Sequence, residues 1–261
     1  MIPTLWAAAT LGFRHHLAYP AEVAIQFVAA CMVAGLNGAL WTAAAAEVSD
    51  LGGVPSLAIR TEVLVAWAGI SAIATRVHED LGERFRDGQI ATDLLRPVSL
   101  PAFVYARDLG RATAAFLVQA VPLIALCAWF APLGLPTSPL RWGLWALALL
   151  GAHAVNVAIS FLLGLGAFRI GSVAGLGALK ATLVSIFSGA LLPLELLGPT
   201  LRGIALVLPF HVLAHTPATV LTGRTPTLAL FAEQWGWAAA LWGLGLLAWR
   251  RVSRTLTIQG G

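Results

Sequence analysis

Six long runs of apolar residues dominate the sequence and constrain its fold more than any other feature. They cover residues 21–45, 59–77, 108–132, 141–167, 172–193 and 228–249. A helix needs about 20 mostly apolar residues to cross the hydrocarbon core of a bilayer. Each run therefore predicts a membrane-spanning helix. We expect an all-α integral membrane protein with six transmembrane helices.

The overall composition agrees with this assignment. Hydrophobic residues make up 59% of the 261 residues and charged residues only 11%, whereas a soluble domain carries about 25% charged residues. The lipid must therefore solvate much of the chain, which we expect to form a single transmembrane domain over residues 1–261. The net charge of +4 does not indicate nucleic-acid binding, because the basic residues form no single stripe or face.

The basic residues between the runs predict an orientation. With the amino terminus inside, the cytoplasmic group holds Arg14, Arg76, Arg84, Arg86, Arg96, Arg107, Arg111, Arg169, Lys180, Arg250, Arg251 and Arg254. The outer group holds only Arg60, Arg141, Arg202 and Arg224. Cytoplasmic loops are enriched in Lys and Arg. We therefore expect a multi-pass protein of the cell membrane with both termini in the cytoplasm.

Two segments outside the runs are predicted to be short helices that do not cross. Residues 1–20 form a weakly amphipathic stretch, which favours an interfacial helix lying on the membrane. Residues 192–227, outside the membrane before the last span, contain five prolines, which break any single helix. We interpret this segment as short re-entrant or interfacial helices. Irregular backbone at membrane depth must be shielded from lipid by protein or must line a water-filled cavity.

The cytoplasmic segment at residues 78–107 has the sharpest pattern. Apolar residues four apart lie on either side of Gly88, and Pro97 ends the pattern, so a helix–turn–helix is predicted. Its apolar face comprises Leu81, Phe85, Ile90, Leu94 and Leu95. Apolar anchors at such spacing are typical of helix docking into a partner's groove. The alternative is a solvated, charged loop on the inner leaflet.

Polar residues inside the predicted spans are the candidates for lining a pathway. They are Asn37, Gln119, His153 and Asn156. Such residues also form ordinary hydrogen bonds between membrane helices, and both interpretations remain open. A proton relay needs ionisable groups in series, and we expect no carboxylate at mid-span beside His153.

The sequence lacks the motifs for ATP hydrolysis and for a complete zinc site. A phosphate-binding loop needs Gly-Lys-Ser/Thr, but the only lysine is Lys180, which follows Leu179. The chain is therefore not expected to hydrolyse ATP. His211 and His215 are four apart, with Glu195 the nearby acid, but a zinc site needs three or four ligands. We expect interfacial histidines and no metal site.

The sequence of the cytoplasmic segment resembles a known family. The stretch Phe-Arg-Asp-Gly-Gln-Ile-Ala-Thr-Asp-Leu-Leu-Arg-Pro-Val-Ser at residues 85–99 is similar to the segment after the second span in type-2 permeases of ATP-binding-cassette (ABC) exporters. Residues 192–195 and 208–211, with Pro217, are similar to the extracellular helices of that family. The basic stretch at 249–251 and the closing residues 259–261 also fit.

This resemblance implies a permease domain that works as a dimer of identical or paralogous chains. It implies two separate ATPase subunits, which supply ATP and Mg chemistry, and no cofactor in this chain. The coupling residues implied are Phe85, Arg86, Asp87, Gly88, Ile90, Leu94, Leu95, Arg96 and Pro97, and the re-entrant residues are Pro193, Glu195, Pro209, Phe210, His211 and Pro217. The cargo stays open. An intramembrane enzyme and a secondary transporter are the alternatives.

Overall fold

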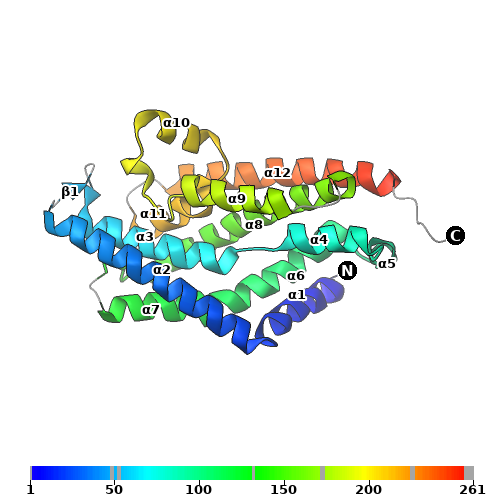
Figure 1. Cartoon of the computed structure of the whole chain (residues 1–261), viewed down its shortest axis with the longest axis horizontal. Helices are drawn as coiled ribbons and strands as arrows, with labels where there is room; N and C mark the ends of the chain where they lie inside the picture. Colours follow the sequence, from blue (N-terminus) through cyan, green and yellow to red (C-terminus); the bar gives the residue numbers. More distant parts are fainter. Residues whose placement is uncertain are drawn as a thin grey trace.

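The computed structural model describes residues 2–47, 50–51, 54–130, 133–170, 174–223 and 227–255. Almost all of these residues are helical, and most helices run along the long axis of the molecule (Figure 1). A single two-residue antiparallel pairing, between β1 (Asp50–Leu51) and β2 (Val54–Pro55), interrupts the helices. Arg224 and the closing residues 259–261 lie outside the described residues.

The first half of the chain contains α1 (Ile2–Leu17), α2 (Pro20–Glu47), α3 (Ser56–Ile73), α4 (Val77–Arg86), α5 (Ile90–Leu94), α6 (Leu100–Ala115), the π-helical turn η1 (Phe116–Ala120) and α7 (Val121–Phe130). The second half contains α8 (Pro139–Ile170), α9 (Ala174–Phe187), η2 (Leu194–Leu196), α10 (Pro199–Val207), η3 (His211–Leu213), α11 (His215–Thr222) and α12 (Thr227–Thr255). The predicted all-helical class is confirmed apart from the small β pairing.

Four helices are long and apolar enough to cross a membrane: Pro20–Ala44, Leu57–Arg86, Leu100–Phe130 and Pro139–Gly166. They correspond to the first four predicted spans. Within the described residues α9 has 14 residues, a length of about 21 Å, which falls short of a hydrocarbon core of about 30 Å. Helix α12 is long enough, at 29 residues, but is not among the four. The six-span count remains a prediction.

Two of the spanning segments are interrupted, and each interruption has a physical cause or a compensation. Between α3 and α4, residues 74–76 leave the helical conformation. The side-chain amide of Asn156 in α8 donates to the backbone oxygen of Ile73 at 2.8 Å, so one carbonyl freed at the break is paired. Between α6 and α7, the π turn η1 precedes Pro122, whose ring cannot supply the backbone donor of a regular α-helix.

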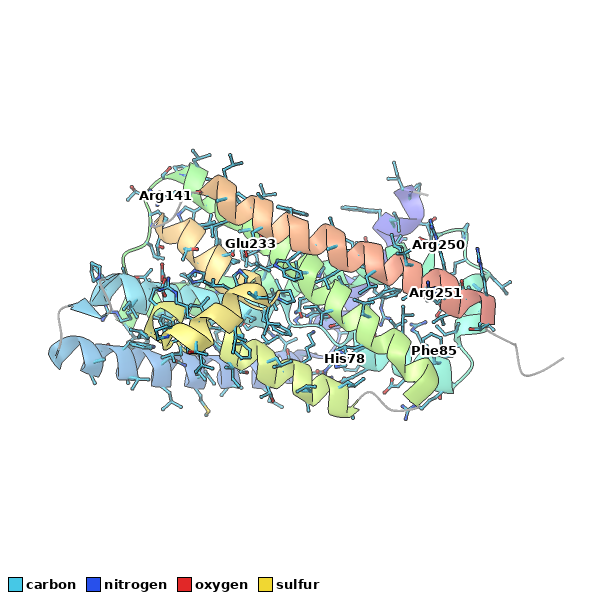
Figure 2. All side chains as sticks on the ribbon, turned by 90° about the horizontal axis from the view of Figure 1, so that it is seen from above. His78, Phe85, Arg141, Glu233, Arg250 and Arg251 are labelled. Carbon is cyan, nitrogen blue, oxygen red and sulfur yellow. The ribbon has the colours of Figure 1, made fainter. Side chains whose placement is uncertain are left out.

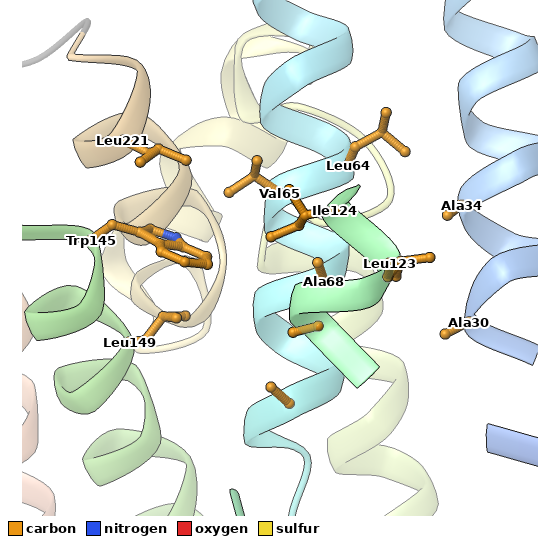
Figure 3. Close-up of a cluster of buried hydrophobic side chains, with 12 residues drawn as sticks. Ala30, Ala34, Leu64, Val65, Ala68, Leu123, Ile124, Trp145, Leu149 and Leu221 are labelled. Carbon is orange, nitrogen blue, oxygen red and sulfur yellow. The ribbon is translucent and has the colours of Figure 1, made fainter. Parts of the chain in front are cut away.

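One hydrophobic cluster joins helices that are far apart in the sequence. Figure 3 shows it from α2 through α3 and α7 to α8 and α11. Alanines 30 and 34 of α2 face leucines on α3 and α7, and Trp145 of α8 lies close to Leu221 of α11. Small side chains on one helix allow close approach of the next, as is usual between membrane helices.

The charged residues separate along the long axis. Figure 2 shows Phe85, Arg250 and Arg251 at one end of the molecule and Arg141 toward the other. Arg250 and Arg251 belong to the group predicted to be cytoplasmic, and Phe85 belongs to the predicted cytoplasmic segment. Arg141 belongs to the outer group. The structure thus keeps the two groups apart, while the orientation itself stays a prediction.

The segment between α9 and α12 folds as short helices. Helix α10 projects from the body of the molecule (Figure 1). Helix α11, in contrast, packs against α3 and α8, and residues 216–221 within it are all buried. Pro217 occupies the first turn of α11, where no intrahelical donor is required. The chain therefore does contain short helices here, and their proposed re-entrant depth in a membrane remains a prediction.

Candidate functional site

The predicted helix–turn–helix is present, and we refer to residues 77–97 as the α4–α5 hairpin. The turn depends on Gly88, whose φ is +69°. This left-handed conformation is costly for any residue with a Cβ atom. The backbone amide of Asp87 donates to the carbonyl of Glu83 at 2.9 Å and closes the end of α4. The sequence pattern thus predicted the shape of this segment correctly.

A buried carboxylate holds the two arms of the hairpin together. Asp93, which is only 1% exposed, accepts from Nη1 of Arg84 at 2.7 Å and from Nε of Arg96 at 2.9 Å. The guanidinium of Arg96 also lies 4.3 Å from the ring centre of Phe103 in α6. Charge-assisted hydrogen bonds of this length are strong. The sequence analysis did not predict this role of Asp93, although its position between Arg84 and Arg96 in the sequence was an available signal.

The predicted apolar docking face divides into a buried part and an exposed part. Leu81 and Ile90 are buried within the chain, in a cluster with Phe161 of α8 and Trp249 of α12, and Phe85 is partly buried there. Leu94 and Leu95 are 43% and 85% exposed. The first group stabilises the hairpin, and only the second is accessible to a partner.

The accessible surface of the hairpin is continuous. The exposed residues from position 86 to position 97 are Arg86, Asp87, Gly88, Gln89, Thr92, Leu94, Leu95, Arg96 and Pro97. Beside them an open groove of about 350 Å³ runs between Leu94, Arg96, Pro97 and Trp249. Two exposed leucines next to a groove and ringed by charges form a surface suited to a partner protein.

The hairpin is fixed to the body of the molecule by α8 and α9. Helix α4 packs along α8, where Gly164 leaves no room for a Cβ atom beside Leu81. His78, at the start of α4, contacts Gly177 of α9 in the same way. These glycines bring the helix axes close together, so α4 and α8 are expected to move as one unit.

Near the α4–α5 hairpin, a buried ion pair in α6 also contacts a histidine of α8. Asp108 of α6 accepts from Nε of Arg111 at 2.8 Å and contacts Nε2 of His153 at 3.0 Å. The expectation that His153 has no carboxylate partner in the spans is wrong. The predicted span began at Asp108, but α6 begins eight residues earlier at Leu100, which places Asp108 inside the helix and within reach of α8.

The other polar span residues also bond within the chain. Gln119 donates to Gln26 of α2 at 3.1 Å, and Asn37 donates to the carbonyl of Val33, one turn back in its own helix, at 2.9 Å. Asn156 bonds at the α3–α4 break as described. Gln119 also lines a cavity between α1, α2 and α6. Their role in lining a pathway stays a prediction, with Gln119 the best placed.

Sequence analysis missed a second buried acid in the spans. Glu62 of α3 is 4% exposed and accepts from the hydroxyl of Thr222 in α11 at 2.7 Å. Lys180 of α9 is buried as well and donates to Ser160 of α8. The partners are between 20 and 160 positions apart in sequence, and no spacing rule connects them.

At the end opposite the hairpin, His211 is buried and fully bonded. Its Nδ1 lies 2.7 Å from the carbonyl of Leu208, and its Nε2 lies 3.0 Å from Glu233 of α12. The expected acidic neighbour was Glu195, whereas the carboxylate beside this histidine belongs to Glu233. His211 is thus a buried link to α12, and its position at the membrane interface stays a prediction. Among the described residues no group of three or more His, Cys, Asp or Glu side chains could hold a metal ion.

The remaining residues of the predicted re-entrant set belong to the short helices on either side of α10. Pro193 precedes η2, which contains Glu195, Phe210 precedes η3 and is buried, and Pro209 is half-buried. The contact of α11 with α12 can position these two helices relative to each other.

Comparison with known proteins gives one match. A family model described as "ABC-2 family transporter protein" matches residues 55–260, well over half of the chain. No curated protein and no solved structure matches the chain. The matched region begins just before α3 and includes the α4–α5 hairpin, the buried ion pair and the segment before α12.

Proposed function

The chain belongs to the ABC-2 family of transporter proteins, and we propose that it is the membrane permease subunit of an ATP-driven exporter. The family and the apolar helices make it a membrane transport component. This membership favours transport over an intramembrane enzyme or a secondary transporter. The observation that carries the proposal is the α4–α5 hairpin, which is braced internally and exposes Leu94 and Leu95 at the end of α5.

We assign the exposed part of the hairpin as the docking surface for an ABC ATPase. Apolar anchors surrounded by charges are the usual composition of a specific helix-in-groove contact. Asp93 is already paired with Arg84 and Arg96, so the hairpin keeps its shape without the partner. A preformed docking element loses less conformational entropy on binding than a flexible loop would. Two ATPase subunits, carrying ATP and Mg, would dock on two permease chains.

The second permease chain, identical or paralogous, has an available surface on α2. Ile25, Val28, Met32, Leu36 and Leu40 are all at least half exposed and repeat at steps of three and four, so they share one face of the helix. Lipid or a second permease can cover this face. In this arrangement both termini lie in the cytoplasm of the cell and six helices cross its membrane.

Movement of the hairpin would reach the membrane through α8. The contact of α4 with α8 is extensive, and residues 74–76 separate α4 from α3. A force applied at Leu94 and Leu95 is therefore transmitted to α8 and to α12, which packs on α8. Transport then follows from a change in how α8, with α12 packed on it, lies against α3.

The decisive experiment combines Arg86→Glu with Leu94→Asp and co-expresses the variant with the cognate ATPase. Both residues are exposed, so the variant is expected to insert and fold, to lose co-purification of the ATPase and to lose ATP-driven transport in vesicles. Leu140→Asp, which places the same charge on an exposed leucine far from the hairpin, is the matched control and should retain both. Normal transport by the double variant would refute the docking assignment.

A further inference from the structure

A cavity of about 330 Å³ opens between α1, α2, the α3–α4 break and α6. Its wall carries charges of both signs, and the residues used below are His16, Glu22, Arg76, Asp80, Arg107 and Arg111. The volume lies within the range of sites that take small ligands. Its lining includes residues of α1, α2, α4 and α6 and neither of the exposed leucines of the hairpin.

The ionic groups around the cavity are of two kinds. Arg111 is engaged by Asp108 at 2.8 Å and is not available to a ligand. Arg76, in contrast, lies 3.8 Å from Glu22 and 3.7 Å from Glu79, and Arg107 and Asp80 lie 3.4 Å apart. Glu22 also accepts a hydrogen bond from the side chain of Gln26 at 3.0 Å. Charge-assisted hydrogen bonds between an arginine and a carboxylate are normally about 2.7–2.9 Å long. The arginine–carboxylate pairs of Arg76 and Arg107 are therefore close enough to balance charge and too far apart to be strong bonds.

His16 provides a further polar group. Its Nε2 atom is buried and has no hydrogen-bond partner among the described residues. Burial and the nearby Arg111 lower the pKa of His16 below its ordinary value of 6.5, so the ring is neutral at pH 7. A buried polar nitrogen without a partner costs free energy, and a ligand in the cavity would relieve that cost.

We propose that this cavity binds a phosphoethanolamine headgroup, with the phosphate on Arg76 and the ammonium on Glu22. A zwitterion inserted between these two residues exchanges one long contact for two shorter ones and leaves the net charge of the cavity unchanged. A headgroup with net negative charge would instead meet the carboxylates of Glu22 and Asp80. The neutral His16 and the Arg107–Asp80 pair lie deeper and can complete the contacts to the phosphate and the amine.

The surroundings identify a membrane lipid as the source of this headgroup. Ile25, one turn along α2 from Glu22, is 71% exposed and begins the apolar face that continues to Leu40. Acyl chains attached to a headgroup at Glu22 would lie along this face. The soluble alternative is a free phosphoethanolamine compound, which shares the polar contacts and lacks the apolar ones.

The test measures binding to the purified full chain in detergent by calorimetry, and it needs no ATPase. Short-chain phosphatidylethanolamine, short-chain phosphatidylglycerol, glycerophosphoethanolamine and inorganic phosphate are compared. We expect the ethanolamine lipid to bind at least about tenfold tighter than the glycerol lipid, because only the former can reach Glu22 with a charge-assisted bond. Glu22→Gln and Arg76→Gln should each remove this preference.

Arg14→Gln is the matched control, because Arg14 is an exposed arginine of α1 that does not line the cavity; the preference should survive in this variant. Weaker binding of glycerophosphoethanolamine than of the lipid identifies the lipid as the source, and equal binding identifies a soluble compound. Equal binding of both lipids, tighter binding of phosphatidylglycerol or of phosphate, or an unchanged preference in Glu22→Gln would overturn the proposal. None of these results bears on ATPase docking.

Discussion

At the scale of single residues, two buried aspartates hold together the end of the molecule that carries the α4–α5 hairpin. Asp93 pairs with two arginines inside the hairpin, and Asp108 with Arg111 and His153 between α6 and α8. Neither was predicted from the sequence, because an acid within a charged loop or at the edge of an apolar run has many possible partners. The sequence pattern predicted the apolar positions of the hairpin, but it did not distinguish the buried positions from the exposed ones. The side chains that bury them, Phe161 and Trp249, come from helices distant in sequence.

The brace at Asp93 leads to a prediction about the stability of the hairpin. Asp93→Ala leaves the guanidinium groups of Arg84 and Arg96 without their acceptor, and we expect it to destabilise the protein by about 1–3 kcal/mol, since both arginines are partly solvated. It should also weaken ATPase binding, because the exposed leucines lose their support. Thermal unfolding in detergent and co-purification are the measurements.

Asp87→Ala is the control for this change, because Asp87 is an exposed aspartate of the same hairpin. Its thermal stability should stay close to that of the wild type. Equal stability of the Asp93→Ala variant and the wild type would mean that the brace contributes nothing to the fold.

At the scale of elements, apolar length predicts helices well and interruptions poorly. The runs at residues 21–45 and 141–167 correspond closely to α2 and α8. The α3–α4 break contains neither proline nor glycine, so no local signal marked it, and the compensating hydrogen bond comes from Asn156. The closest helix packing also had no visible signal: α1 lies against α6 through Gly12 and Gly110, each facing backbone of the other helix.

This glycine contact leads to a prediction about α1. A Cβ atom at Gly12 would overlap the carbonyl of Arg107, so Gly12→Ala should separate α1 from α6 and lower the melting temperature. Gly143→Ala is the matched control, because Gly143 also lies in a helix but has open space around it. There the higher helix propensity of alanine should stabilise the protein by up to about 1 kcal/mol. Equal effects of the two changes would contradict the close approach.

At the scale of the whole molecule, charge and hydropathy carried most of the information. They predicted a helical membrane protein, and the family match and four apolar helices agree with that class. The number of crossings does not follow from hydropathy alone, because α9 is short within the described residues and α12 carries Glu233 and Gln234 among its tryptophans. The polar contacts between helices depend on the three-dimensional arrangement of the whole bundle.

The orientation is testable by labelling single introduced cysteines with a membrane-impermeant thiol reagent, after replacement of Cys31 and Cys127 by alanine. Six crossings with both termini inside predict that Arg86→Cys and Arg251→Cys react only after the cells are opened. Arg141→Cys should react in intact cells. The positive-inside bias is the physical reason. Reaction of the Arg251→Cys variant in intact cells would contradict the six-crossing topology.

Helix α11 has a consequence for the resting state of the protein. Most of this short helix is buried, with its Thr216 and Thr219 and with Gln234 of α12 among the buried residues. If the path of the proposed permease passes α11, cargo can leave there only after this helix has moved. We therefore expect the protein to conduct no ions along that path while it is at rest.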